Sequence, residues 1–374
     1  MTAYLLEAAV RRYDWGSVTA IPRLSGNEPD GSPVAELWFG AHPDDPARVV
    51  PRGIGLDTFI AADPEPALGP GVVERFGPRL PYLMKLLAAD KPLSMQVHPN
   101  VAQAEAGFAA EDAAGIPRGA PNRNYRDRHH KPELLCALTP FDALCGFRPV
   151  AETIDLLDNL DVPELAFLRD ALAGEDPLRT AFARTLALPD PAPVAAAVAA
   201  QVTPDGPSRG VWLAARDFSG DVGVVLALLL NHVRLRPGQA IFLGAGNVHA
   251  YLSGMGVEIM AASDNVLRCG LTSKHIDAGE LLQITDFVEL PNPIWPAGAE
   301  GFTVPVPDFA LFPVQSGDEH ELHIAGPRIV LCTNGRLEVA GTSVPPGKAV
   351  FVPASAAALS LTGAGSGFVA AVGR

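Results

Sequence analysis

Residues 237–243, PGQAIFL, join a Pro-Gly turn to a short apolar run, which is typical of a turn that opens a β-strand. The same pattern returns at residues 346–352, PGKAVFV, at an offset of 109 residues (346 − 237). Two copies of a β-barrel unit would explain this repetition. At the same offset His249 aligns with Ala358, so the repeat predicts that only the first copy keeps a metal-capable imidazole.

The residue pattern of the rest of the chain changes twice, from β-type runs to helical spacing and back to β-type runs. Residues 1–149 hold short β-type runs between Pro and Gly turns, and we expect mostly strand there. The runs are 35–40, 93–98 and 134–138. Residues 151–232 carry apolar residues at helical spacing, which predicts short helices. The breaks between these helices are Pro163, Pro177, Pro191 and Gly206. Strands return from Val233 onward, and Asn334-Gly335 indicates a hairpin turn.

The composition is that of a folded protein. The chain has 374 residues, of which 48% are hydrophobic, and its 36 Gly and 36 Pro favour many turns. Its formal charge of −14 opposes binding to nucleic acid and to anionic membranes, so an anionic substrate must be drawn in by a few specific cations. No apolar run approaches the roughly 18 residues of a membrane span. Residues 1–17 lack the features of a secretory signal, so we expect a cytoplasmic protein.

The cysteines fit the same compartment. They are scattered without a CxxC pair, which favours reduced and buried thiols over a disulfide framework or a thiolate zinc site. They are Cys136, Cys145, Cys269 and Cys332.

Three stretches of the sequence carry metal-type donors at strand spacing. Gln96 and His98 lie two residues apart, so on a strand both side chains project from one face. Lys131 and Glu133 share parity in the same way, and His249 lies near the end of another apolar strand. Two imidazoles, one carboxylate and one amide oxygen form a donor set suited to zinc, with water or substrate completing it. With one carboxylate the site would keep net positive charge and could polarise hydroxyl or carbonyl oxygens.

A fourth stretch, residues 258–274, carries Asp264, Arg268 and Lys274 among small and apolar residues. The guanidinium of Arg268 could bind a phosphate or stabilise a developing oxyanion. Without further context, a structural ion pair between Arg268 and Asp264 across a turn is the favoured interpretation.

Several motifs, in order along the chain, resemble those of type I phosphomannose isomerases. They are residues 13–16 (YDWG), 36–38 (ELW), 91–99 (KPLSMQVHP), 125–133 (YRDRHHKPE) and 249–268 (HAYLSGMGVEIMAASDNVLR). The likeness spans nearly the whole chain. It implies a mainly β fold of two cupin (jelly-roll) barrels with an α-helical insertion. This agrees with the helical spacing at residues 151–232 and with the repeat.

The resemblance also implies domain boundaries and residue roles. We expect a discontinuous catalytic cupin domain at 1–150 and 233–295, a helical insertion at 151–232 and a C-terminal cupin-like domain without metal at 296–374. The family's functional residues fall on the zinc ligands Gln96, His98, Glu133 and His249, on the essential Arg268, on the active-site Lys131, on the neighbouring His130 and Asp264, and on Ser94 as a substrate contact. Three positions depart from the signatures: His129 stands in place of Asn, Cys269 of Ala and Ser273 of Pro.

The activity implied is interconversion of D-mannose 6-phosphate and D-fructose 6-phosphate through a cis-enediol. The resemblance predicts one Zn²⁺ per chain and a cytoplasmic monomer whose partner is a small sugar phosphate, with neither nucleic acid nor membrane. Lys131 is an acid/base candidate, and Asp264 and His130 are alternative proton carriers. Three other readings stay open: a cupin phosphosugar isomerase of other specificity, an iron-dependent dioxygenase and a sugar-binding module. Lys131 and Arg268 favour an anionic sugar over an apolar dioxygenase substrate.

Overall fold

The strands of the computed structural model form two large sheets, one of 11 strands and one of 10. The structure describes residues 3–298, 301–315, 320–356 and 359–373. Every pairing between the strands named below is antiparallel. The prediction of a mainly β chain is confirmed in this form.

The 11-stranded sheet contains most strands from the first three-quarters of the chain. They are β2 (Ala9–Arg11), β3 (Glu36–Gly40), β6 (Tyr82–Ala89), β7 (Met95–Val97), β8 (Glu133–Ala137), β9 (Phe141–Phe147), β10 (Leu230–Leu235), β11 (Ala240–Leu243), β12 (His249–Ala261), β13 (Leu267–Gly270) and β14 (Ile294–Trp295). The long strand β12 belongs to two layers: its second half lies between β6 and β8, and its first half pairs with β7 and β9. The start of β12 therefore lies beside β7, with β8 paired further along the same strand.

The 10-stranded sheet combines the C-terminal strands with three from the start of the chain. They are β1 (Tyr4–Glu7), β4 (Arg48–Val49), β5 (Ile54–Gly55), β15 (Phe302–Thr303), β16 (Ala310–Gln315), β17 (His320–Leu322), β18 (Arg328–Val339), β19 (Thr342–Val344), β20 (Ala349–Val352) and β21 (Leu359–Ala371). Leu5 of β1 lies opposite Val350 of β20. Sequence reading did not anticipate this long-range pairing.

The repeated stretch has a structural counterpart in each sheet. Strands β11 and β20 begin and end at the same offset of 109 residues, and each follows a turn glycine with positive φ, 86° at Gly238 and 75° at Gly347. Ala358, the counterpart of His249, lies outside the described residues. The hairpin predicted at Asn334-Gly335 is wrong, because both residues continue β18 and pair with β21. Gly335 has a φ of 66° and lies beside a register irregularity in that ladder. A glycine adopts such a positive φ without the strain that another residue would meet there.

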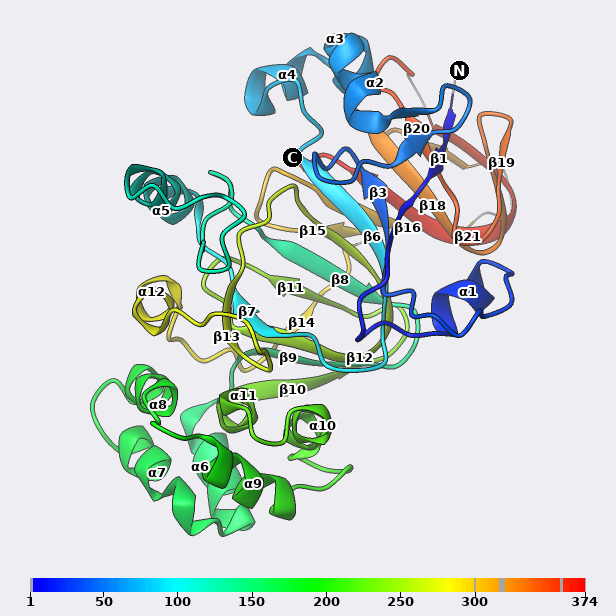
Figure 1. Cartoon of the computed structure of the whole chain (residues 1–374). Helices are drawn as coiled ribbons and strands as arrows, with labels where there is room; N and C mark the ends of the chain where they lie inside the picture. The colour runs from blue at the N-terminus through cyan, green and yellow to red at the C-terminus, as the bar shows by residue number, and fades with distance from the viewer. Residues whose placement is uncertain (1–2, 299–300, 316–319, 357–358, 374) are drawn as a thin grey trace.

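The helices occupy three regions. Helices α1 to α5 lie within residues 1–149, so the expectation of mostly strand there was too simple. Helices α6 to α11 gather at one end of the molecule, beneath β10, and α12 lies beside β13 (Figure 1). The bounds are α1 (Ala20–Leu24), α2 (Leu56–Ala62), α3 (Pro64–Leu68), α4 (Pro70–Phe76), α5 (Val101–Ala113), α6 (Val150–Leu160), α7 (Ala166–Leu172), α8 (Pro177–Leu186), α9 (Ala192–Gln201), α10 (Arg209–Asp217), α11 (Val222–Leu226) and α12 (Ala278–Ile284), with 3₁₀ turns at Pro163–Leu165 and Ala227–Leu229.

The predicted helix breaks are confirmed for a local reason. Pro163 and Pro177 each stand at the first position of a helical segment, where the missing N–H costs nothing and the fixed φ suits the helix. One large apolar cluster joins these helices to β7, β9, β12 and β13, and a second fills the space between the two sheets. Within the described residues, no helix combines the length and the apolar character that crossing a membrane requires.

A buried carboxylate fastens the helical end to the sheet. Asp142 of β9, with 5% of its side chain exposed, accepts hydrogen bonds from Nε and Nη2 of Arg209 on α10, both at 3.0 Å. His232 of β10 donates to the same carboxylate at 2.7 Å. Burial acts to raise the pKa of Asp142, but His232 and Arg209 outweigh it and hold the pKa well below its usual range.

Asp142→Asn is expected to lower the free energy of unfolding by about 2 kcal/mol at pH 7, because it leaves the partly buried guanidinium of Arg209 without its counter-charge. The folded-state pKa is depressed, so this stabilisation is present above the unfolded value of about 4 and is lost as pH falls toward the folded value. Urea denaturation of the wild type and the variant at pH 7 and pH 3 measures the difference between their free energies of unfolding. An equal difference at the two pH values contradicts this role of the Asp142 carboxylate.

Candidate metal centre

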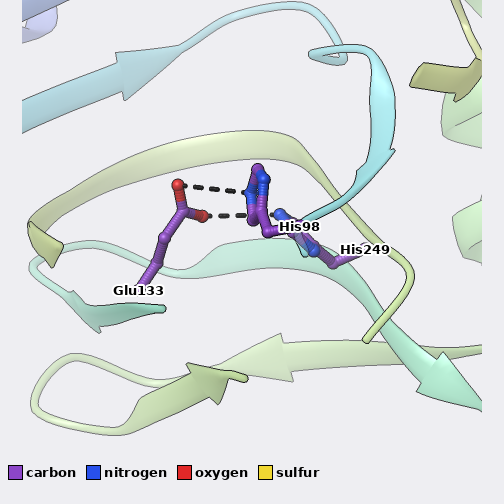
Figure 2. A group of neighbouring side chains, drawn as sticks. All are labelled: His98, Glu133 and His249. Carbon is purple, nitrogen blue, oxygen red and sulfur yellow. Dashed lines mark ion pairs between the residues drawn. The ribbon is translucent and has the colours of Figure 1, made fainter. Parts of the chain in front are cut away.

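Three buried side chains from separate strands point at one another (Figure 2). Glu133 begins β8, His249 begins β12 and His98 directly follows β7. Nε2 of His98 lies 3.5 Å from Oε1 of Glu133, and Nε2 of His249 lies 3.4 Å from Oε2. Neither imidazole is exposed, and the carboxylate is 2% exposed. Three of the four predicted ligands therefore lie together in the structure.

The donor atoms of this group fit a metal ion. Nε2 of His98, Oε2 of Glu133 and Nε2 of His249 are buried and have no hydrogen-bond partner. Unpaired buried polar atoms cost free energy, and native proteins rarely leave three of them facing one another. A divalent cation shared by the three atoms would remove that cost, and two imidazoles with one carboxylate are ligands that zinc accepts.

The outer nitrogens of both imidazoles fix the tautomer that a metal needs. Nδ1 of His98 lies 2.8 Å from the carbonyl oxygen of Asn265, and Nδ1 of His249 lies 3.0 Å from that of Asn247. A carbonyl oxygen only accepts, so each Nδ1 carries the proton and donates. Each Nε2 is then left with a free lone pair directed at the centre.

The electrostatics favour the ligand forms of His98 and Glu133. Burial, with Lys131 adding to it, lowers the pKa of His98 to about 4, so its imidazole is neutral at physiological pH. Burial acts to raise the pKa of Glu133, but Lys131 and His98 outweigh it, and the pKa lies well below its usual range. The neutral imidazole and the carboxylate are the protonation states in which these residues bind metals.

The fourth predicted ligand, Gln96, lies on β7 at the edge of this group. Its Cα is paired with that of His249 on one side and with that of Arg268, on β13, on the other. Directly opposed residues in a sheet project from the same face. Gln96 and Arg268 therefore face the side of the sheet from which His249 projects, and the half-buried Ser94 precedes β7 with the same parity.

Lys131 and Asp264 border the centre. Nζ of Lys131, a buried side chain, donates to Oε1 of Glu133. Oδ2 of Asp264 lies 3.3 Å from Nε2 of the buried His42, whose Nδ1 accepts from the backbone N–H of Asp44. Burial acts to raise the pKa of Asp264, but the hydrogen bond from His42 outweighs it and lowers the pKa. The ion pair between Arg268 and Asp264 that the sequence alone favoured is not formed.

His130 is held by the other half of the chain. Its Nε2 lies 2.8 Å from Oδ2 of Asp308, a buried residue in the connection between β15 and β16. This contact occupies one of the two ring nitrogens of His130. The neighbouring His129, which departs from the family signature, lies with Nδ1 3.5 Å from Nη2 of Arg79.

Three cations on and around β13, Arg126, Arg268 and Lys274, interact through their charges. The pKa of Arg268 is lowered by burial and by the charge of Arg126, and the pKa of Lys274 is lowered chiefly by Arg268, then by burial and by Arg126. Mutual repulsion of this kind requires proximity. Sequence reading missed Arg126 as a member of the group, although it lies inside the motif at residues 125–133. A cationic cluster in a chain of net charge −14 is where an anionic ligand would bind.

Asn265 ties the cationic segment to the metal centre. Its Oδ1 accepts from the backbone N–H of Arg126 at 2.7 Å, and its Nδ2 donates to the carbonyl oxygen of His129 at 2.8 Å. Its own carbonyl orients His98. The two sequence motifs that resemble the family signatures are therefore cross-linked through one buried amide.

A buried charge network behind Glu133 escaped sequence reading. Nζ of Lys85 on β6 lies 2.8 Å from Glu258 and 3.6 Å from Glu36, and Tyr251 donates to Glu258 at 2.8 Å. The two carboxylates outweigh burial and raise the pKa of Lys85. The available signal was a lysine inside YLMKLLAA, an otherwise apolar strand, since a buried charge requires a partner.

The four cysteines and Ser273 are not among the side chains that make up the candidate metal centre. All four cysteines are free and buried, as predicted. Burial raises the pKa of Cys269, one of the departures from the signature, so its thiol is inert. Ser273, another departure, is exposed beside Lys274.

Comparisons with known proteins agree on one family. Residues 4–150 match the catalytic domain of type I phosphomannose isomerase. Mannose-6-phosphate isomerases of Shigella flexneri and Escherichia coli are each 39% identical to the chain over 96% of both lengths, and the human enzyme is 31% identical over 90% of the chain and 82% of its own length. A crystal structure of zinc-bound mannose 6-phosphate isomerase superposes over all of both chains, with a TM-score of 0.92 and 35% sequence identity.

Proposed function

The chain belongs to the type I phosphomannose isomerase family, and on that premise we propose that it interconverts D-mannose 6-phosphate and D-fructose 6-phosphate with one Zn²⁺ per chain. The observation that carries the proposal is the set of three buried and unpartnered ligand atoms on His98, Glu133 and His249. A zinc ion needs such a set, and an apolar binding pocket does not.

The metal would be held by Gln96, His98, Glu133 and His249. The amide oxygen of Gln96 completes four protein ligands, and its register opposite His249 supports this role. A zinc ion held there supplies a Lewis acid that stabilises negative charge on the oxygens at C1 and C2 of the sugar.

The reaction moves one hydrogen between neighbouring carbons. After the sugar ring opens, a base removes the proton from C2 while the carbonyl oxygen at C1 takes up a proton, which gives a cis-enediol. A proton is then added to C1 while the oxygen at C2 loses its proton, which gives the ketose. The protein must therefore supply one group that accepts a proton and one that donates.

Asp264 and Lys131 are the pair we assign to these transfers. Asp264 is ionised because its pKa is lowered, and its carboxylate is 32% exposed, so it can accept a proton from a bound sugar. The ammonium of Lys131, which already donates to Glu133, can donate to a sugar oxygen beside the metal. His130 ranks below them because its Nε2 is engaged by Asp308.

The phosphate of the substrate would bind to the cluster of Arg126, Arg268 and Lys274. Arg268 offers a bidentate fork, and Lys274 adds a point charge at the exposed side of the cluster. Arg268 lies directly across from Gln96, so it can bind the phosphate or stabilise the enediolate. Ser94 borders the same strand and would add a hydroxyl contact.

The finer description of the fold belongs to the same proposal. We take the two sheets as two cupin barrels, with the catalytic domain at 1–150 and 233–295, the helical insertion at 151–232 and a metal-free domain at 296–374. The matched bounds of β11 and β20 support this division. We also propose a monomer that acts in the cytoplasm, where four free and buried thiols are stable.

A coupled assay of fructose 6-phosphate formation tests the function. The purified protein is expected to convert mannose 6-phosphate, to lose activity on chelation and to regain it with zinc, under air and under strict anoxia alike. D-Glucose 6-phosphate, the C2 epimer, is the matched control for specificity and is expected to react far more slowly. Full activity in protein without any bound cation overturns the proposal.

A further inference from the structure

The carboxylate of Asp221, in the helical region, accepts hydrogen bonds from the residues that follow β13, the strand that carries Arg268. Asp221 precedes α11, and its Oδ1 accepts from the backbone N–H of Gly223 at 2.7 Å, as a helix cap does. The same oxygen accepts from the N–H of Leu271 at 2.6 Å, and Oδ2 accepts from that of Thr272 at 3.2 Å. Two of its three hydrogen bonds therefore leave its own helix.

The segment held in this way is strained and closely packed. Leu271 adopts a φ of 52°, in the left-handed region that a leucine avoids, and it is buried. Such a conformation persists only where the surroundings hold it. The contact also excludes side chains, since a Cβ on Gly270 would lie 2.4 Å from Cα of Gly223. The start of α11 thus lies directly against the end of β13.

Hydrogen bonds continue from this contact to the cationic cluster. The backbone N–H of Lys274 donates to Oγ1 of Thr272 at 3.1 Å. Thr272, which is bonded to Asp221, therefore also restrains Lys274. Lys274 is close enough to Arg268 for the charge of Arg268 to lower the pKa of Lys274. Like charges repel, so the exposed Lys274 stays beside the half-buried Arg268 only where its backbone is held.

We propose that Asp221 is a positioning residue for phosphate binding: it fixes the turn at 271–274 so that Lys274 stays beside Arg268. The helical region thereby sets the affinity of the site for sugar phosphates without touching them. The inference rests on the proposed function, because it assigns the cluster to the substrate phosphate.

Asp221→Ala tests the inference in zinc-loaded protein. KM for mannose 6-phosphate and the inhibition constant of inorganic phosphate are each expected to rise about tenfold, since Lys274 is no longer held beside Arg268 and one charged contact to the phosphate weakens. Zinc content and kcat are expected to stay within about twofold of the wild type, because uniform binding is what is lost. Asp221→Asn keeps one acceptor oxygen and should lie between the two.

A double-mutant cycle separates positioning from general loosening. If Asp221 acts through Lys274, the double variant with Lys274→Ala binds phosphate about as weakly as Lys274→Ala alone. Asp142→Asn, which loosens the same end of the molecule through α10, is the matched control and should lower stability while leaving the phosphate inhibition constant unchanged. Additive losses, or an unchanged KM and inhibition constant in Asp221→Ala, overturn the inference.

Calorimetric titration with inorganic phosphate keeps this test distinct from that of the proposed function. If the wild type binds phosphate but does not convert mannose 6-phosphate, the proposed reaction fails while the comparison with Asp221→Ala still decides the role of Asp221. If Asp221→Ala binds phosphate as tightly as the wild type does, the inference fails even in an active isomerase.

Discussion

His249→Ala is expected to remove both the bound metal and the activity. The variant deletes one of three buried ligand atoms that converge on one point, and the imidazole that it removes is oriented by the carbonyl oxygen of Asn247. Loss of a ligand and of the charge stabilisation that the metal provides should lower kcat/KM by at least about 10³-fold, equivalent to about 4 kcal/mol of transition-state stabilisation. Metal analysis of the purified variant and the coupled assay measure the two effects.

Cys332→Ala is the matched control for this experiment. Cys332 is equally buried, but it lies on β18 in the 10-stranded sheet, where its Sγ contacts the carbonyl oxygen of Asn334. Its loss should leave zinc content and kcat unchanged. If His249→Ala keeps stoichiometric zinc and wild-type turnover, the proposed metal centre is wrong.

Arg268→Ala is expected to lower kcat/KM by about 10²–10³-fold, the usual cost of removing a preorganised charge from a developing oxyanion or a phosphate. Arg268→Lys should recover only a small part of the loss, because a point charge does not reproduce the guanidinium fork. Steady-state kinetics with mannose 6-phosphate give kcat and KM separately. A loss confined to KM assigns Arg268 to phosphate binding, and an equal loss in kcat assigns it to the reacting oxygens.

Arg184→Lys serves as the control for the arginine series, since Arg184 is an exposed residue of α8 whose contact is a backbone carbonyl of the same helical region. Its kinetics should match the wild type. Wild-type kinetics in Arg268→Ala would remove Arg268 from the site altogether.

Three of the four residues that the sequence offers as metal ligands lie together in the structure, and the metal centre itself stays a proposal. His98, Glu133 and His249 lie in contiguous motifs in which strand parity already decides which side chains share a face. The helix breaks at Pro163 and Pro177 were predictable for the same reason, because a proline acts on its own backbone and needs no distant partner.

Other contacts between distant residues could not be predicted from the sequence. The sequence singled out Asp264 but paired it with Arg268, whereas the fold brings Nε2 of His42 to within 3.3 Å of its carboxylate. Asn334-Gly335 failed for a related reason, since a local turn preference gave way to the long ladder between β18 and β21.

The pairing of β1 with β20 has a consequence for synthesis on the ribosome. Strand β1 keeps one edge open until residues near 350 have emerged from the ribosome, so the 10-stranded sheet cannot close before β20 has been synthesised. An unpaired edge during that interval invites intermolecular association, and a chain that stops short of β20 would keep that edge permanently.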